Sequence, residues 1–434
     1  IQMHLTRVPM RVQNLSIGMF VGRLDRPWLD TPFIFQGFEI KDKNEIALLQ
    51  RHCSQVYVEI ERGKLAEKTI RALAVSNSPI VHVLGEHESG PDGPGWLHRF
   101  VVRTGLGNFL RRRRTVSGDY AVTSTVRKEA PEARRAYERC VKAYRRIYAR
   151  AGRAGFVDID RVTNAVTPVI RSILRNPNAM AWTVFQGKRS SRHYSRAVAT
   201  SVWATMFGRH LGFDRKGLEH LAIGGLLLDI GNTEVPDDVV QAEGAITMDE
   251  YAEVPRHVEA GAKILRRSPG IHPAVFEMVM YHHERYDGSG YPYGLSGSNI
   301  PAFGRIAGIV DCYDAMTTKN AYSPALAAYD AARELNEMRD QKFSGEVVEQ
   351  FMHMIGMFPT GSVVELSDGS IGLVLEQNPD NLLQPKVLIL RLKGKKSLRK
   401  PRLMNEKDWN GRGLWIAKGH EHGAFGIDPA DYFN

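Results

Sequence analysis

Short runs in which apolar and polar residues alternate, separated by Gly and Pro turns, characterise residues 1–84. Alternation along Gln55–Ile60 is typical of a β-strand with one buried face. By contrast, Asn44–His52 has its apolar residues at helical spacing. This pattern predicts a small α+β regulatory module over residues 1–84.

Apolar residues recur at helical spacing from residue 158 to about residue 351. Asp229 ends one apolar run, His282 and His283 end another, and Asp311 lies inside a third. Carboxylates inside apolar runs are rarely buried without a partner. We therefore expect an all-helical domain over residues 158–358 whose helices bring these side chains to one polar point.

Residues 85–157 separate these two parts and are predicted to form a flexible basic loop followed by a linker helix. The loop is rich in Gly, Pro and charged residues and contains Arg111–Arg114. The helix, Glu129–Arg153, has one apolar stripe of Tyr137, Val141, Tyr144 and Tyr148. That stripe suits either a packing face within the chain or the seam of a homodimer.

Beyond residue 358, a Pro-Thr-Gly boundary leads into apolar runs of strand length. Residues 362–366 and 371–375 flank an Asp-Gly turn and predict a β-hairpin, and residues 387–392 supply another strand. We expect Asp340–Met357 to be the last helix, followed over residues 359–434 by a small β-rich module whose tail wraps back. The fold class is therefore mainly α, with α+β and β-rich flanking modules.

Composition narrows the setting in which such a protein works. The chain has 434 residues and three cysteines, too few for a disulfide framework, which favours a reducing cytoplasm. No run approaches the ~20 apolar residues of a membrane span, so no transmembrane segment is expected. The net charge of +10 suits a polyanionic ligand, but no aromatic platform accompanies the basic run, so no specific nucleic acid is expected.

Candidate chemistry concentrates in one eleven-residue string, His-His-Glu-x-x-Asp-Gly-x-Gly-Tyr-Pro, at residues 282–292. Imidazole and carboxylate are the preferred ligands of divalent Fe, Mn, Ni and Zn. The string resembles the signature of the HD-GYP family, and the resemblance extends roughly over residues 173–357. The N-terminal stretch also resembles an uncharacterised domain that is often fused ahead of HD-GYP modules.

Active members of that family hydrolyse cyclic di-GMP at a two-metal site, and the resemblance carries over residue by residue. It implies that Asp229 bridges the metals and is the catalytic carboxylate. It further implies that His257, His282 and His283 bind one metal and that Asp311 binds the other. Taken alone, any one of these histidines is more often a structural residue than a ligand.

Three positions depart from the family pattern, and together they remove ligands from one metal. Leu228 stands where the His of the His-Asp pair is expected, Asn232 replaces a Lys, and Arg196 falls where an earlier ligand His is expected. His193, one helical turn away, is the alternative ligand if the register slips. We therefore expect one divalent metal rather than two, with the Arg196 guanidinium neutralising Asp229 and Asp311 in place of the other.

A further set of residues borders the substrate groove by resemblance: Arg285, Gly290, Tyr291, Pro292 and Lys319. A purely structural interpretation of the turn, in which Gly supplies positive φ and Pro fixes a bend, competes with this one.

The function expected from the sequence is that of a degenerate HD-GYP protein in cyclic di-GMP signalling. It would bind cyclic di-GMP or a partner such as a diguanylate cyclase, with weak or no hydrolysis. The alternatives are an active metal-dependent phosphodiesterase that yields pGpG or GMP, and a metal-free structural adaptor.

Overall fold

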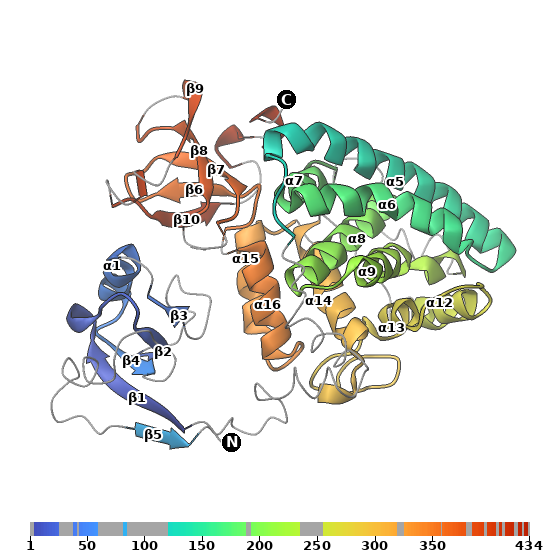
Figure 1. The fold of residues 1–434 in the computed structure, drawn as a ribbon, viewed down its shortest axis with the longest axis horizontal. Helices are drawn as coiled ribbons and strands as arrows, with labels where there is room; N and C mark the ends of the chain where they lie inside the picture. Colours follow the sequence, from blue (N-terminus) through green and yellow to red (C-terminus); the bar gives the residue numbers. More distant parts are fainter. Residues whose placement is uncertain are drawn as a thin grey trace, which may run out of the picture. The chain divides into compact units, whose positions relative to one another are not determined.

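The computed structural model describes residues 4–25, 38–40, 43–59, 81–84, 120–187, 192–234, 255–318, 325–356, 358–378, 384–394, 397–404, 408–409, 413–420, 424–427 and 429–432. The chain divides into two compact units, residues 1–95 with 405–415, and residues 96–404 with 416–434. As predicted, the fold is mainly α-helical with small β-sheets toward the two ends of the chain (Figure 1). The finer four-part division of the sequence stays a prediction.

The smaller unit contains a five-stranded antiparallel sheet in the order β3-β2-β4-β1-β5. Its elements are β1 (His4–Arg11), β2 (Phe20–Leu24), β3 (Phe38–Glu39), α1 (Lys43–His52), β4 (Gln55–Glu59) and β5 (Val81–Leu84). Met10 pairs with Val56 and Val8 with Val58, and all four are fully buried. The predicted strand and helix of this α+β module are therefore confirmed.

The larger unit consists mainly of helices, and one of them, α14, is buried over most of its length. They are α5 (Val126–Ala154), α6 (Ile159–Arg175), α7 (Pro177–Gly187), α8 (Arg192–His210), α9 (Arg215–Leu227), η4 (Ile230–Glu234), α12 (Arg256–Arg266), α13 (Pro273–Tyr281), α14 (Ala302–Thr317), α15 (Ala328–Glu337) and α16 (Gly345–Ile355). Most of α14 is buried, including Asp311 and Asp314. A helix that is buried on nearly all sides is a core helix, so its two carboxylates need partners inside the protein.

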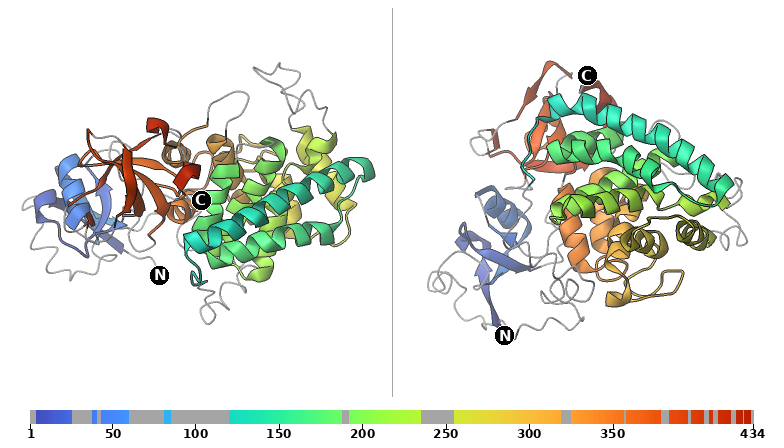
Figure 2. Two further views of the ribbon diagram at one scale, coloured as in Figure 1. Left: turned by 90° about the horizontal axis from the view of Figure 1, so that it is seen from above. Right: turned by 45° about the vertical axis from the view of Figure 1, so that its right-hand side comes forward.

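Helix α5 runs along one edge of this unit beside α6, while α12 and α13 lie along the other edge (Figures 1 and 2). The Thr125 side chain caps the first turn of α5, and α5 ends at Gly155, which has a φ of 69°. Tyr137 is 3% exposed and its hydroxyl donates to the Ser195 carbonyl on α8 at 2.9 Å. The tyrosine stripe of α5 is thus a packing face within the chain.

Small residues allow α8 and α9 to approach closely just before the polar centre. A Cβ on Gly225 would lie 2.8 Å from the Ser201 Cα of α8, and a Cβ on Gly208 would overlap Leu221. Any larger residue at these positions would push the helices apart. The position of Asp229, two residues beyond the end of α9, depends on this close packing.

A second antiparallel sheet, in the order β10-β6-β7-β8-β9, follows the helices. Its strands are β6 (Val363–Leu366), β7 (Ile371–Glu376), β8 (Lys386–Arg391), β9 (Ser397–Leu403) and β10 (Ile416–His420). The predicted hairpin is present, and β10, in the C-terminal tail, pairs with β6. Among the described residues, no helix is long and apolar enough to cross a membrane.

The start of the last helix differs from the prediction. Helix α16 begins at Gly345 rather than Asp340, because Asp340 adopts a φ of 57° in a turn whose carboxylate accepts a hydrogen bond from the Gly345 amide at 2.6 Å. Asp tolerates the left-handed conformation better than most residues, so this turn is compatible with its sequence.

Candidate metal centre

Asp229, His257, His282 and His283 reach one centre from the ends of three helices. Asp229 lies between α9 and η4, His257 lies in the first turn of α12, and the two other histidines follow α13. A Cβ on Gly231 would overlap the His257 carbonyl oxygen, so η4 lies directly on the start of α12. This contact holds Asp229 beside His257.

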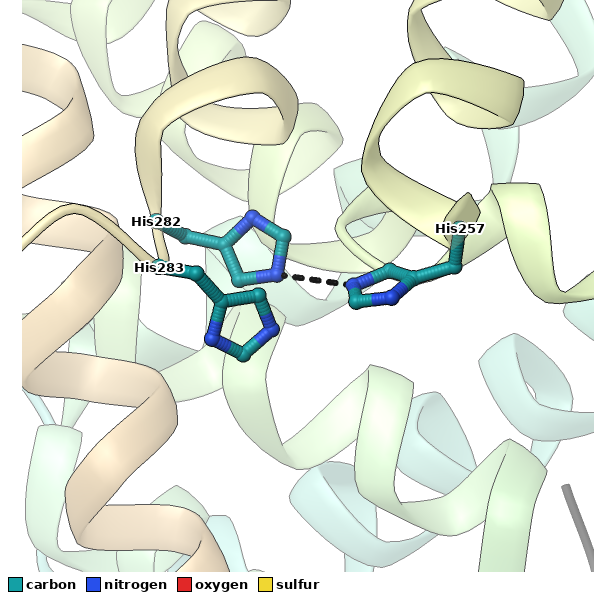
Figure 3. Close-up of side chains that lie close together, drawn as sticks. All are labelled: His257, His282 and His283. Atoms are coloured by element: carbon teal, nitrogen blue, oxygen red, sulfur yellow. Dashed lines mark hydrogen bonds between the residues drawn. The ribbon is translucent and has the colours of Figure 1, made fainter. Parts of the chain in front are cut away.

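Side-chain nitrogens of the three histidines converge, with ligand atoms all within 4.8 Å of one another (Figure 3). The Nε2 atoms of His257 and His282 are 3.4 Å apart. The Asp229 Oδ1 atom lies 3.5 Å from the first of these nitrogens and 3.9 Å from the second. The predicted cluster of Asp229 and three histidines is therefore brought together.

Burial keeps the imidazoles of His282 and His283 neutral. It lowers the pKa of His282 to about 4, and the neighbouring His257 adds to the effect. It also holds the pKa of His283 well below its ordinary value. Because His282 Nδ1 lies 3.0 Å from the Val279 carbonyl, we assign the ring proton to Nδ1, which leaves Nε2 as an acceptor.

This donor set fits a divalent metal. Imidazole nitrogens and one carboxylate are suitable ligands: the three histidines converge, and Asp229 lies beside two of them. The His283 ring also stacks against Tyr291, with centroids 4.6 Å apart, which fixes its orientation.

The Arg196 side chain, on α8, points to the remaining carboxylates, Asp311 and Asp314. Its Nη2 atom donates to Asp311 Oδ1 at 2.7 Å, and its Nε atom lies 3.9 Å from Asp314 Oδ2. The Asp311 carboxylate raises the pKa of Arg196 above its ordinary value, and Asp229 and Asp314 add to the effect. Although 36% of the Arg196 side-chain surface is exposed, its Nε atom is buried.

The other two departures from the family pattern, Leu228 and Asn232, lie close to Asp229 in the sequence. Leu228 is 2% exposed and offers no ligand atom, and Asn232 donates its backbone N–H to the Asp229 carbonyl at 3.0 Å. His193 belongs to α8, but its side chain lies outside the described part of the chain. Asp311, expected to bind the other metal by resemblance, accepts a hydrogen bond from Arg196, in line with the expected neutralisation of this carboxylate.

The loop that carries the Gly-Tyr-Pro residues is anchored by Glu284. This carboxylate is 3% exposed and accepts hydrogen bonds from the backbone N–H groups of Tyr293 and Leu295, both at 2.8 Å. Gly290 packs against the backbone of residues 283–285, where a Cβ would overlap it, and Pro292 follows a cis peptide bond. The loop is therefore held firmly beside His283.

Two residues expected to face substrate are placed differently or not described. The Arg285 guanidinium donates to the carbonyls of His282 and Glu284, both at 3.0 Å, and lies 5.3 Å from the centre of the Phe343 ring. These contacts give it a structural role as well as a charge near the site. Lys319 lies outside the described residues.

Sequence reasoning missed the roles of Asp314, Glu284 and Tyr144. Asp314 lies one helical turn from Asp311, is 0% exposed and faces Arg196. A second acid in the same apolar run was the available signal. Tyr144 is also 0% exposed, and the nearby Asp229 charge adds to the burial that raises its pKa. Its place in the apolar stripe of the predicted helix indicated burial, but no local pattern marked its position near Asp229.

Comparison with known proteins assigns the class. Residues 184–347 match the HD domain family, and residues 8–162 match a domain of unknown function, DUF3391. The first span contains Arg196, Asp229, the three histidines and Asp311.

Cyclic di-GMP phosphodiesterases of other bacteria are similar to this chain. A cyclic di-GMP phosphodiesterase of Pseudomonas aeruginosa is 29% identical over 388 residues, which are 89% of this chain and 85% of that protein. One of Thermotoga maritima is 33% identical over 33% of this chain and 39% of its own length. A solved HDG"Y"P protein of Bdellovibrio bacteriovorus aligns over 80% of this chain and 98% of its own, with 14% identity and a TM-score of 0.33. The matched HD domain and the similar cyclic di-GMP phosphodiesterases together support an HD-GYP family protein.

Proposed function

We propose that this protein acts in cyclic di-GMP signalling by binding the dinucleotide at a centre with one metal, with weak or no hydrolysis. The ligand class is suggested by the names of the relatives. The single observation that carries the degenerate reading is the Arg196–Asp311 ion pair, because it uses a carboxylate that a second metal would need.

Asp229, His257, His282 and His283 would hold the metal, which would supply a Lewis acid for a phosphate oxygen. Fe, Mn, Ni and Zn all suit this donor set. Arg196 then provides a fixed positive charge that acts on Asp229 and Asp311. A phosphodiester carries one negative charge, so the metal and the guanidinium would both favour its binding.

Binding and hydrolysis make different demands, and Arg196 meets only the first. A guanidinium stays protonated, so it cannot accept a proton from an attacking water. Nor does it offer a coordination position at which the pKa of a water falls, as a second metal would. Asp229, the expected catalytic carboxylate, therefore lacks the partner that would activate water on that side.

The first test measures metal content per chain and cyclic di-GMP binding in the presence of Mn²⁺, alongside hydrolysis to pGpG or GMP. We expect about one metal, saturable binding and little or no turnover. His282→Ala/His283→Ala should lose both metal and ligand. Two metals with rapid turnover would show an active phosphodiesterase, and binding that survives the double substitution would show a metal-free adaptor.

A gain of function tests the same idea in the opposite direction. Arg196→His/Leu228→His replaces the two departures with imidazoles, and we expect it to bind a second metal and to raise hydrolysis at least tenfold. Leu228→His alone is the matched control, because Arg196 still occupies Asp311. If the double variant binds no more metal than the control, Arg196 is not what excludes the second metal.

A further inference from the structure

An elongated cavity of about 340 Å³ lies between α5 and α6, away from the metal centre. Its apolar wall includes Ile147, Val157 and Ala165, which are 2–8% exposed. Small side chains at Ala143 and Ala165 leave the space open where larger ones would interdigitate. Pro168, inside α6, also lines it. The cavity is therefore a groove between two helices with an apolar floor.

Arginines rim this groove. Arg139, Arg146 and Arg150 of α5 are exposed, and Arg161 contributes from α6. Arg161 is held by Asp158 at 3.0 Å, whereas no ion pair to the other three is found among the described residues. Elsewhere on α5, arginines do have acidic partners, as in the Arg134–Glu138 pair at 3.0 Å. The positive charge is thus left uncompensated at the groove.

This arrangement costs stability, which makes it informative. Arg146 and Arg150 are four residues apart on one helix, a spacing at which like charges repel by a few tenths of a kcal/mol. Helix α5 as a whole carries ten Lys and Arg residues against three Glu residues. An acidic partner would remove the repulsion.

We propose that the α5–α6 groove docks an acidic amphipathic helix of a partner protein. Arg139 and Arg150 are eleven positions apart, or about 16 Å along the helix axis, which is longer than a single phosphate or carboxylate ligand. Groove packing of a third helix would bury its apolar stripe on Ile147 and Ala165, and its flanking carboxylates would meet the arginines.

Other occupants fit the surface less well. The exposed large apolar side chains of the described chain are Ile17, Val122, Tyr293, Leu403 and Phe425, and none lies on α5 or α6. The groove therefore offers no side chain for insertion into a lipid surface. A second copy of this basic face would be repelled by charge.

A direct test uses fluorescence anisotropy with a labelled helical peptide that has one leucine stripe flanked by glutamates, and with a scrambled peptide of the same composition. We expect saturable, salt-sensitive binding of the first only. Arg146→Glu/Arg150→Glu should weaken it at least tenfold, whereas Arg127→Glu/Lys128→Glu, the same charge change at the other end of α5, should not. Ala143→Trp should block binding by filling the groove with the charges intact.

Equal binding of the scrambled peptide, or an equal loss in the Arg127/Lys128 control, would overturn the proposal. So would tight binding to phosphatidylglycerol vesicles without peptide binding, which would make the face a membrane contact. Circular dichroism of each variant confirms that α5 is folded. Metal content and cyclic di-GMP binding should stay unchanged in Arg146→Glu/Arg150→Glu, so this proposal and the proposed function fail separately.

Discussion

The positive charge of Arg196 compensates buried carboxylates, as a bound metal ion would. It lies between Asp311 and Asp314, which are 5% and 0% exposed, and its Nη2–Oδ1 distance of 2.7 Å is that of a charge-assisted hydrogen bond. Two carboxylates this deeply buried require a cation, whether a metal or a guanidinium. Under the proposed function, the Arg196 guanidinium takes the place of a second metal beside Asp311.

Arg196→Ala should therefore destabilise the protein in the presence of a chelator. Breaking a fully buried ion pair costs about 3–5 kcal/mol, and we expect about 2 kcal/mol here because Arg196 is partly exposed. Excess Mn²⁺ should restore part of the loss, since the freed carboxylates can then bind a metal. Chemical denaturation with EDTA and with Mn²⁺ measures both effects.

Arg196→Lys is the control, because it keeps a positive charge near Asp311. We expect a smaller loss and a weaker response to Mn²⁺. If Arg196→Ala is as stable as the natural protein in EDTA, the ion pair contributes nothing to the fold.

Tyr144→Phe should make the protein more stable. The Tyr144 hydroxyl is fully buried and has no hydrogen-bond partner among the described residues, which costs about 1–3 kcal/mol. Its ring packs against Tyr148 and Tyr194 with centroids 6.0 and 6.2 Å away, and Phe preserves those contacts. We expect the free energy of unfolding to rise by about 1 kcal/mol, whereas Tyr137→Phe, which loses a hydrogen bond to Ser195, should lower it.

At this scale the sequence predicted the convergence of Asp229, His257, His282 and His283, because a spaced motif carries that information. It also predicted that Arg196 would face carboxylates. It did not predict that Asp314 is one of them, since the choice between a surface cap and a buried charge depends on how α14 is surrounded.

Among elements, the loop after α13 depends on one buried acid. Glu284→Gln keeps the shape of the side chain, but one of its two terminal atoms becomes an N–H donor facing a backbone N–H group. We expect a loss of about 1–3 kcal/mol and faster amide exchange at Tyr293 and Leu295. The exposed Glu259→Gln on α12 is the control, and unchanged exchange in Glu284→Gln would show that the loop is held by other contacts.

A stacked histidine pair joins α9 to the start of α13 and should respond to pH. The rings of His220 and His272 are 3.7 Å apart, and burial, with the second ring adding to it, lowers the pKa of His220 to about 4. The unfolded chain takes up this proton at an ordinary pKa of about 6.5, so stability falls as the pH drops from 6.5 toward 4. His220→Gln should reduce the loss of stability between pH 7 and pH 5.

Exposed His353→Gln on α16 controls for the number of histidines in that comparison. An unchanged acid sensitivity in His220→Gln would place the effect elsewhere.

Element boundaries in general were predicted well where caps or turns are local, as in the Asp-Gly hairpin. The start of α16 was missed because the Asp340 turn is stabilised by a contact to Gly345 across the boundary.

At the scale of the molecule, family and packing divide the chain differently. The domain of unknown function extends to residue 162 and so includes all of α5, yet α5 packs into the helical unit that contains the metal centre. Its Glu129 is 3% exposed and accepts two hydrogen bonds from Arg175 of α6 at 2.7 Å. The Tyr137 hydroxyl of α5 also donates to the Ser195 carbonyl on α8, which lies within the HD-domain match, so a change in α5 can reach a helix of that domain directly.

Two shortened proteins test whether the HD domain needs α5. A protein of residues 120–434 keeps the helix, whereas one of residues 156–434 loses it and exposes the faces of α6, α7 and α8 that it covers. Burial of a large apolar side chain contributes about 1.5–3 kcal/mol, and Tyr137, Tyr144 and Ile147 alone approach the ~5–15 kcal/mol that holds a domain together.

We expect the longer protein to stay monodisperse and to bind Mn²⁺, and the shorter one to aggregate, as measured by size-exclusion chromatography and metal analysis. Equal metal binding by both would make α5 a dispensable linker and restore a domain boundary near residue 158.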